Sequence, residues 1–350
     1  MANISGIPHQ LNNSAAIPPP RFPRILNVLI VYSAVAVLVL SIASNLLALA
    51  VCTHIYKRSP SVMLGYLASL SVANLCFSFL ACVDFSVHFD ASGELACKME
   101  GFLTETSYIS AILILVCISY ERMTVVATPI LARLKRFRFR KWLPVSVWVV
   151  SLVLCSPLLF FYTRRHGHCT SILLGSFPRL LFYVLQTVFL FILSLLFMLW
   201  AHIKIFKTLA RHSVFRKGSS SAAKIFRSDA KLTKMLVAVM VIFFVCHTPF
   251  MAMLLMLNLG MAKGTLLWQT AFRVSQLVMF TQTCINPFIY CFFSKQFRQS
   301  CKEVLTCRCG DSRVSSNRYR GTSGTTSIEL QAVSSFAGRG VVHEKEVTVL

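Results

Sequence analysis

Seven runs of mainly apolar residues, each long enough for a membrane-spanning helix, dominate this sequence of 350 residues. A helix rises ~1.5 Å per residue, so about 20 apolar residues cross the ~30 Å hydrocarbon core of a bilayer. The runs cover residues 25–52, 61–87, 101–120, 142–161, 180–201, 232–259 and 266–293. Charged residues make up only 13% of the chain, against ~25% in soluble domains. We therefore expect an all-α membrane protein, a seven-transmembrane helix bundle with a short amphipathic eighth helix.

The distribution of positive charge predicts the orientation of this bundle. The chain carries 35 Lys and Arg against 12 Asp and Glu, a surplus that by itself is compatible with nucleic-acid binding. However, 27 of these cations lie in the loops after spans one, three and five and in the C-terminal tail. Loops rich in Lys and Arg stay on the cytoplasmic side. The N-terminus is thus expected outside the cell, the C-terminus in the cytoplasm and the protein in the plasma membrane, with no nucleic-acid partner. Arg179 is assigned to the outer side, and Arg273, inside the seventh span, is the one cation assigned to neither side.

These assignments divide the chain into an extracellular segment (1–24), the bundle (25–293), an amphipathic helix (294–309) and a disordered cytoplasmic tail (310–350). Two sequons in the first segment make Asn3 and Asn12 candidates for glycosylation. The tail is rich in Ser and Thr, and its phosphorylation would create a binding site for arrestin. Thr348 and Leu350, among the last three residues, fit a ligand of a PDZ protein.

The cysteines separate by the side of the membrane on which they lie. Cys97 and Cys169 occupy outward, oxidising positions, and we expect a disulfide between them, with two free thiols as the alternative. Cys307 and Cys309 follow the last span on the cytoplasmic side, beside basic residues, a setting typical of palmitoylation and contact with membrane lipids. A zinc site at these two residues lacks a second pair of ligands, and ordinary reduced thiols are the other alternative.

Short motifs appear in a fixed order along the seven spans. They are Asn45 in the first span, Glu121-Arg122-Met123 at the end of the third, Cys246-His247-Thr248-Pro249 in the sixth and Asn286-Pro287-Phe288-Ile289-Tyr290 in the seventh. This ordered set resembles the rhodopsin-like (class A) G-protein-coupled receptors from about residue 25 to residue 309.

The resemblance implies a conformational switch that activates a heterotrimeric G protein. Arg122 would be held at rest by Glu121 and Asp229 and released towards the G protein on activation. Pro249 and Pro287 remove helical hydrogen bonds and would kink the sixth and seventh helices. The full set of switch residues is Glu121, Arg122, Asp229, Phe243, His247, Pro249, Asn286, Pro287 and Tyr290.

Three departures from the family pattern change what we expect. Asn74 and Ala111 stand where the family usually has Asp and Ser, so a sodium ion would find a neutral shell. His247 replaces the usual tryptophan. We expect a buried histidine whose hydrogen bonds are satisfied, with a pH-sensitive switch as the alternative. The fifth span has no proline between Arg179 and Ala201, which leaves the ligand class less determined.

Charged residues within spans point to the ligand site, because such charges are costly in a membrane. Asp84, Glu105 and Arg273 all fall in the outer half of the bundle. The other expected ligand-binding residues are Thr104, Tyr108, Phe250, Leu254 and Gln276. Mixed charge above an apolar floor suits an extracellular peptide, and the alternative is a lipid or a small acidic ligand. A purely structural ion pair between Glu105 and Arg273 is the competing interpretation.

Other classes of protein find less support. A seven-helix transporter would be expected to show internal repeats, and none is evident. An enzyme is not expected, because the sequence contains no metal-binding H-E-x-x-H, nucleophile elbow or phosphate-binding loop. We therefore expect neither a cofactor nor a metal.

Overall fold

The computed structural model describes residues 24–87, 93–127, 142–165, 168–171, 176–215, 220–261 and 265–306. Within these ranges, the side chains of residues 24, 84–87, 164–165, 168, 170–171, 212–215 and 220–229 are also outside the description. The predictions for Asn3, Asn12, Cys307, Cys309, Thr348 and Leu350 therefore lie outside the described residues, as do the side chains of Asp84 and Asp229.

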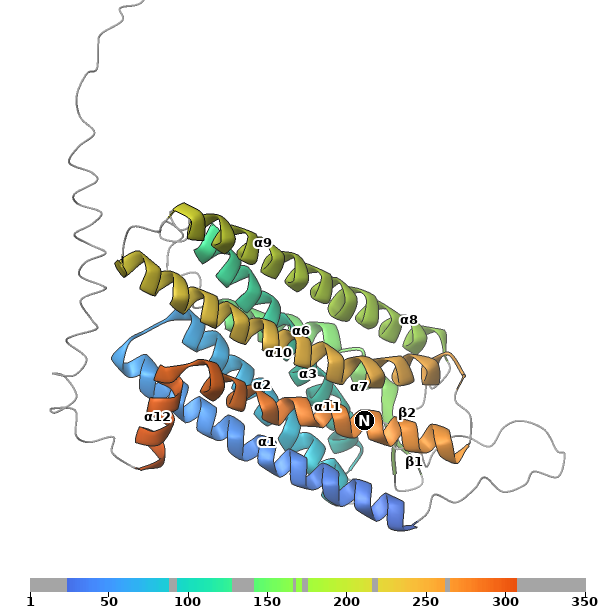
Figure 1. The fold of residues 1–350 in the computed structure, drawn as a ribbon. Helices are drawn as coiled ribbons and strands as arrows, with labels where there is room; N and C mark the ends of the chain where they lie inside the picture. The colour runs from blue at the N-terminus through green and yellow to red at the C-terminus, as the bar shows by residue number, and fades with distance from the viewer. Residues whose placement is uncertain are drawn as a thin grey trace, which may run out of the picture.

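Long helices packed side by side form the body of the molecule (Figure 1). They are α1 (Arg24–Arg58), α2 (Val62–Val87), α3 (Glu94–Ala127), α6 (Leu143–Cys155), α7 (Leu158–Phe161), α8 (Phe177–Leu185), the π-helix η2 (Gln186–Ile192), α9 (Leu193–Phe215), α10 (Ser220–Asn258), α11 (Leu266–Phe293) and α12 (Lys295–Leu305). By length and apolar character, six helical segments of the described chain could each cross a membrane, and α11 with α12 makes a seventh if this bent pair is counted as one span. The predicted seven-helix bundle is confirmed, and the protein is a multi-pass membrane protein.

Helix α3 is the centre of the bundle. In its most apolar stretch 61% of the residues are buried, against 22% for α1. Large apolar side chains instead cover the outward faces of the peripheral helices, for example at Val39, Val153 and Phe189. Such faces would destabilise a soluble protein but match a surrounding layer of lipid.

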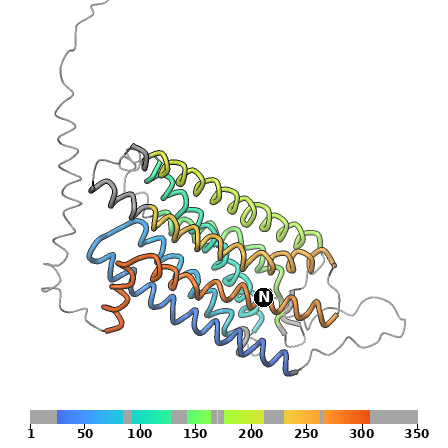
Figure 2. The backbone as a smooth tube through the Cα atoms, in the orientation of Figure 1, coloured from blue at the N-terminus to red at the C-terminus, as the bar shows by residue number. Residues whose placement is uncertain are grey.

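Polar side chains join the helices where lipid provides no hydrophobic drive for association. The side-chain amide of Asn45 on α1 donates to the Thr283 carbonyl on α11 at 2.9 Å. Asn74 on α2 donates to Oδ1 of Asn45 at 3.3 Å. The hydroxyls of Ser41 and Ser78 lie 2.7 Å apart and add a second link between α1 and α2. Buried hydrogen bonds therefore position α1, α2 and α11, which lie together in the tube view (Figure 2).

Prolines and one π-helical stretch interrupt the regular helices. Pro157 lies between α6 and α7, while Pro249 and Pro287 lie inside α10 and α11. The fifth span, α8–η2–α9, has no proline in its middle, but η2 occupies that place over seven residues. A π-helical stretch widens the turn and changes the direction of the following side chains, and such stretches are frequent at functional sites.

Helix α12 turns away from α11 at 110°. Ser294 ends α11 and caps α12, because its Oγ accepts a hydrogen bond from the Phe297 amide at 3.2 Å. Phe297 and Cys301 are buried on the inner face of α12. On the other side, Glu303 accepts a hydrogen bond from Arg58 of α1 at 2.7 Å. The predicted amphipathic helix is thus present, as Lys295–Leu305, and is attached to the end of α1.

Candidate functional site

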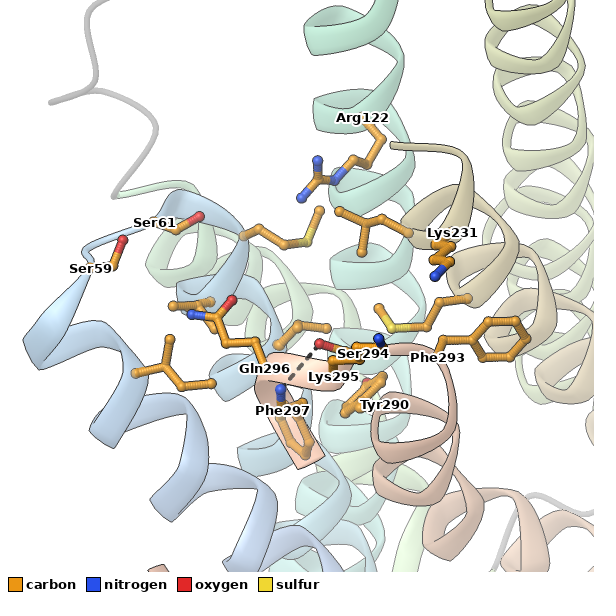
Figure 3. Close-up of a pocket in the computed structure, with 16 residues that line it drawn as sticks. Ser59, Ser61, Arg122, Lys231, Tyr290, Phe293, Ser294, Lys295, Gln296 and Phe297 are labelled. Atoms are coloured by element: carbon orange, nitrogen blue, oxygen red, sulfur yellow. Dashed lines mark hydrogen bonds between the residues drawn. The ribbon is translucent and has the colours of Figure 1, made fainter. Parts of the chain in front are cut away.

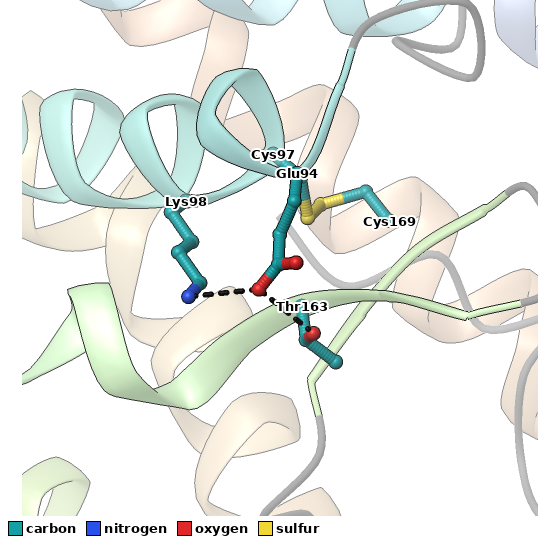
Figure 4. The surroundings of a disulfide bond; sticks show 5 residues. All are labelled: Glu94, Cys97, Lys98, Thr163 and Cys169. Atoms are coloured by element: carbon teal, nitrogen blue, oxygen red, sulfur yellow. Dashed lines mark hydrogen bonds and ion pairs between the residues drawn. A yellow bond between two sulfur atoms is a disulfide. The ribbon is translucent and has the colours of Figure 1, made fainter.

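A short β-hairpin lies at the outer end of α3. Its strands β1 (Tyr162–Arg165) and β2 (His168–Ser171) pair in antiparallel fashion, with Arg164 opposite Cys169. Cys169 forms a disulfide with Cys97 in the first turn of α3, which confirms the predicted bridge (Figure 4). Beside it, the Thr163 hydroxyl donates to Glu94 at 3.4 Å, and Glu94 pairs with Lys98 at 2.8 Å. The hairpin is thereby fastened to α3 at the entrance of the bundle.

Directly beneath this hairpin lies a small cavity, which we call the outer cavity. Its lining comes from α3, β1, α8, α10 and α11 and comprises Glu105, Tyr162, Arg179, Tyr183, Phe250, Leu254, Phe272 and Gln276. Four of the predicted ligand-binding residues therefore meet here: Glu105, Phe250, Leu254 and Gln276. The cavity measures about 20 Å³, room for about one water molecule.

Glu105 has a specific partner in this cavity. Its Oε2 accepts a hydrogen bond from Nε2 of Gln186 at 3.1 Å. Gln186 is the first residue of the π-helix η2 and is buried. The π-helical stretch therefore begins at the residue whose side-chain amide donates to the Glu105 carboxylate. Among the described residues no ion pair joins Glu105 to Arg273, so the Glu105–Arg273 pair considered from the sequence is not formed.

Arg179 contributes a second charge that the sequence assignment missed. The sequence analysis counted it among the cations of the outer side, before the start of the fifth span, whereas the structure places it inside α8, where it is only 1% exposed. Its Nε donates to Oδ1 of Asn258 on α10 at 3.0 Å. Its guanidinium carbon lies 5.4 Å from the centre of the Tyr183 ring, a cation–π distance. Arg179 is thus built into the outer cavity together with Glu105.

A signal for this placement was present in the sequence. Ser176 precedes Pro178 by two residues, and the structure uses Ser176 as N-cap with the proline in the first turn of α8. Serine at the N-cap and proline at the start of a helix are typical beginnings of helices. This pattern would have placed Arg179 at the third position of the fifth span rather than in a loop.

Thr104, Tyr108 and Arg273, three further predicted ligand-binding residues, are not part of this lining, and the side chain of Asp84 is outside the description. Thr104 is buried on α3 beside Glu105. Arg273 is on α11, three residues before Gln276. Tyr108 lies one turn deeper than Thr104, and its ring stacks on that of His247 with centres 5.2 Å apart.

His247 and Phe243 form the layer below the outer cavity. Their rings stack with centres 4.1 Å apart, and Nδ1 of His247 lies 2.8 Å from the Phe243 carbonyl, to which it donates. The predicted switch residues Phe243, His247 and Pro249 thus share α10 with Phe250 and Leu254 of the cavity lining. A displacement of Phe250 or Leu254 would therefore act on the same helix that Pro249 kinks.

A second, larger cavity opens at the opposite end of the bundle (Figure 3), and we call it the cytoplasmic cavity; both cavities are named after the orientation predicted from the sequence. It measures about 820 Å³. Three cations line it, Arg122 from α3, Lys231 from α10 and Lys295 from α12, together with Tyr290 of α11, and its described lining contains no Asp or Glu. The cavity is therefore basic and large enough to accept a segment of a partner protein.

Two of the predicted switch residues, Arg122 and Tyr290, line this cavity. Glu121 is buried next to Arg122 in α3, while the side chain of Asp229 is outside the description. Tyr290 is buried, and its ring meets that of Phe297 at 5.5 Å. Asn286 accepts a hydrogen bond from Gln282 at 3.4 Å, one residue before the kink at Pro287.

Comparison with known proteins agrees with this arrangement. The family described as "7 transmembrane receptor (rhodopsin family)" matches residues 44–290. The B2 bradykinin receptor of Cavia porcellus is 28% identical over 290 residues, which cover 78% of this chain and 77% of that protein. The B2 bradykinin receptor of Homo sapiens is 25% identical over 316 residues, 84% of this chain and 79% of that protein. The C-X-C chemokine receptor type 2 of Oryctolagus cuniculus is 27% identical over 297 residues, 79% of this chain and 78% of that protein.

Proposed function

The chain belongs to the rhodopsin family of seven-transmembrane receptors, and we propose that it binds an extracellular peptide and activates heterotrimeric G proteins. The observation that carries this proposal is the pair of cavities at the two ends of one central helix. Glu105 faces the outer cavity and Arg122 the cytoplasmic cavity, both from α3. Their separation of 17 positions corresponds to ~25 Å along a helix.

A peptide is the ligand class that the outer end favours. The hairpin β1–β2 covers the entrance, and the cavity below it combines Glu105 and Arg179 with the apolar side chains of Phe250 and Phe272. A peptide presents charged ends and apolar side chains together, which matches this lining. Relatives named for bradykinin and for C-X-C chemokines are peptide receptors and support the same class.

Activation would couple the two cavities through α10. Ligand entry requires the lining of the outer cavity to move, because the cavity holds only about 20 Å³. Phe250 and Leu254 belong to α10, so their displacement acts on the kink at Pro249 and on the His247–Phe243 stack below it. Movement of the inner half of α10, which carries Lys231, widens the cytoplasmic cavity around Arg122. A ligand shifts such an equilibrium by its difference in affinity for the two states.

The G protein would engage the cytoplasmic cavity. Its basic lining attracts an acidic or carboxyl-terminated segment, and Arg122 lies at its edge (Figure 3). The proposed orientation, in the plasma membrane with the N-terminus outside, rests on the distribution of Lys and Arg along the sequence. Glycosylation at Asn3 and Asn12, palmitoylation at Cys307 and Cys309, arrestin binding after tail phosphorylation and a PDZ partner at Thr348 and Leu350 remain predictions from the sequence.

The decisive experiment is a peptide and lipid screen on cells expressing the full chain, with dissociation of tagged G-protein subunits as the readout. We expect at least one peptide to evoke dissociation that Arg122→Ala abolishes at equal surface expression. Lys57→Ala is the matched control, because Lys57 is an exposed cation at the same end of the bundle but outside the cavity lining. Ligand-evoked dissociation that survives Arg122→Ala would contradict the proposed mechanism, and responses only to lipids would favour the alternative ligand class.

A further inference from the structure

One buried cation in the outer cavity has an unfilled hydrogen-bonding position. Arg179 is 1% exposed and uses its Nε to reach Asn258 at 3.0 Å. Its Nη1 is buried and has no hydrogen-bond partner among the described groups. The guanidinium carries five N–H donors in a planar fork, and a buried donor without a hydrogen-bond partner is costly.

The neighbouring carboxylate does not fill this position. Glu105 lines the same cavity, but its Oε2 accepts from Gln186 at 3.1 Å, and no ion pair between Glu105 and Arg179 is present in the described part of the chain. Arg179 is instead held in place by the Asn258 amide oxygen and by the Tyr183 ring. The side chain is therefore fixed, charged and directed into a cavity whose own acid is bonded elsewhere.

We propose that Arg179 binds a carboxylate of the ligand, the free C-terminal carboxylate of a peptide whose last side chain is apolar. This inference rests on the proposed function, because it names the ligand group that enters the outer cavity. A carboxylate matches the planar fork of a guanidinium with two parallel hydrogen bonds. Phe250, Leu254 and Phe272 of the same lining would surround the apolar side chain next to it.

Entry of such a group would open the cavity. The present volume of about 20 Å³ accepts one water molecule but not a carboxylate with its side chain. Leu254 and Phe250 must therefore move with α10, while Arg179 keeps its contact with Tyr183 on its own helix. The Arg179–Asn258 hydrogen bond is the link between α8 and α10 that a ligand carboxylate would compete with or reinforce.

Thermal unfolding of the purified full-length receptor in detergent tests this proposal without a G protein. The probes are N-acetyl-Leu-Phe as free acid and as C-terminal amide, and octanoate with octanamide as the fatty-acid pair. A ligand that binds only the native state raises the midpoint of unfolding in proportion to its saturation. We expect the free acid of the dipeptide to reach half-saturation at a concentration at least tenfold below that of its amide.

Matched variants assign this selectivity to one cation. Arg179→Gln should remove the difference between acid and amide, whereas Lys98→Gln, which removes an outer cation from the Glu94 pair, should keep it. If Arg179→Gln does not fold, Asn258→Asp serves instead, since the new carboxylate would occupy the guanidinium and weaken binding of the acid at least tenfold while leaving the amide unchanged.

Several outcomes would overturn the proposal: equal shifts by acid and amide, no shift by any probe, selectivity that survives both Arg179→Gln and Asn258→Asp, or selectivity lost only in Arg273→Gln. A shift by octanoate alone, lost in Arg179→Gln, would support the carboxylate contact and overturn the peptide as its source. Failure of the G-protein screen with acid selectivity intact would count against the proposed signalling and not against this contact.

Discussion

The ring of His247 stacks on that of Phe243 at 4.1 Å, and its Nδ1 donates to the Phe243 carbonyl at 2.8 Å. The same ring also stacks on that of Tyr108 of α3 at 5.2 Å, and the centres of the Tyr108 and Phe243 rings lie 6.3 Å apart. The three rings thus form one aromatic cluster between α3 and α10, in which His247 is 2% exposed. Its position two residues before Pro249 connects this cluster to the kink of α10.

Replacing His247 should separate packing from hydrogen bonding. We expect His247→Ala to lower the free energy of unfolding by about 2–5 kcal/mol, because it leaves a cavity between two rings. His247→Phe keeps the stack, loses one side-chain hydrogen bond and should cost less than ~1.5 kcal/mol. Thermal unfolding of both variants in detergent measures the difference. Equal losses would mean that the hydrogen bond to Phe243, rather than ring packing, dominates.

Two glycines form a matched pair for testing the contact between α3 and the hairpin. A Cβ on Gly101 would come closer than 3.0 Å to three atoms of the Tyr162 ring, whereas a Cβ on Gly65 would meet nothing within 4 Å. Gly101→Ala should destabilise the receptor by about 1–3 kcal/mol through overpacking and disturb the outer cavity that Tyr162 lines. Gly65→Ala should be neutral or stabilising by up to ~1 kcal/mol, because alanine has less freedom in the unfolded chain. The two substitutions are compared by the midpoints of thermal unfolding, and a larger loss for Gly65→Ala would refute the close packing of the Tyr162 ring on Gly101.

Sodium should have little effect on this receptor. Asn74 donates to Asn45 at 3.3 Å, and Asn45 in turn donates to the Thr283 carbonyl, so amides fill the region with their own hydrogen bonds. A hard cation prefers anionic oxygen ligands. We expect equal thermal stability and equal agonist affinity in sodium chloride and in choline chloride at the same ionic strength. Asn74→Asp should introduce a sodium dependence, and a large sodium effect in the parent that Asn74→Ala abolishes would contradict the prediction.

The attachment of α12 to α1 should depend on ionised Glu303. Partial burial raises the pKa of Glu303, but hydrogen bonds from His54 and Arg58 and their positive charge outweigh this, so its pKa is lowered overall. A lowered folded-state pKa stabilises the folded state above the unfolded value of ~4.3, and this contribution disappears as the pH falls through the folded-state pKa. The pair is partly exposed, so it contributes at most ~1 kcal/mol.

Amide hydrogen exchange of α12 measures this attachment. Glu303→Gln should increase exchange in α12 at neutral pH, with Glu94→Gln, which breaks the 2.8 Å pair with Lys98 at the other end of the bundle, as control. Equal protection of α12 in the parent and in Glu303→Gln would show that burial of Phe297 and Cys301 alone holds the helix.

Much of the architecture was predictable from local features of the chain. The seven spans follow from the length of the apolar runs, and the Cys97–Cys169 disulfide follows from the outward position of both residues. Glu105 was singled out because charged residues inside a span are costly, and it lines the outer cavity. Each of these predictions needs only the type of a residue and its depth in the membrane, both of which are read from the local sequence.

Other features depend on partners distant in the sequence. Gln186 has no local pattern that marks it, and its role appears only when η2 directs its amide to Glu105 across the bundle. The burial of Arg179 was not predictable, because its guanidinium is held beside α10 by Asn258, 79 positions away. The cytoplasmic cavity likewise combines Arg122, Lys231 and Lys295 from three separate helices.

The sequence by itself determined the number of spans, their expected orientation and that lipid surrounds the bundle. The reason is that the free-energy cost of placing each residue in lipid is local and nearly additive. Only the tertiary structure decided which polar groups meet: Glu105 with Gln186, Arg179 with Asn258 and Asn45 with Asn74. The reason is geometric. A hydrogen bond requires two groups within ~3 Å in the right direction, and the rotation of each helix, including the widened turn of η2, sets that distance.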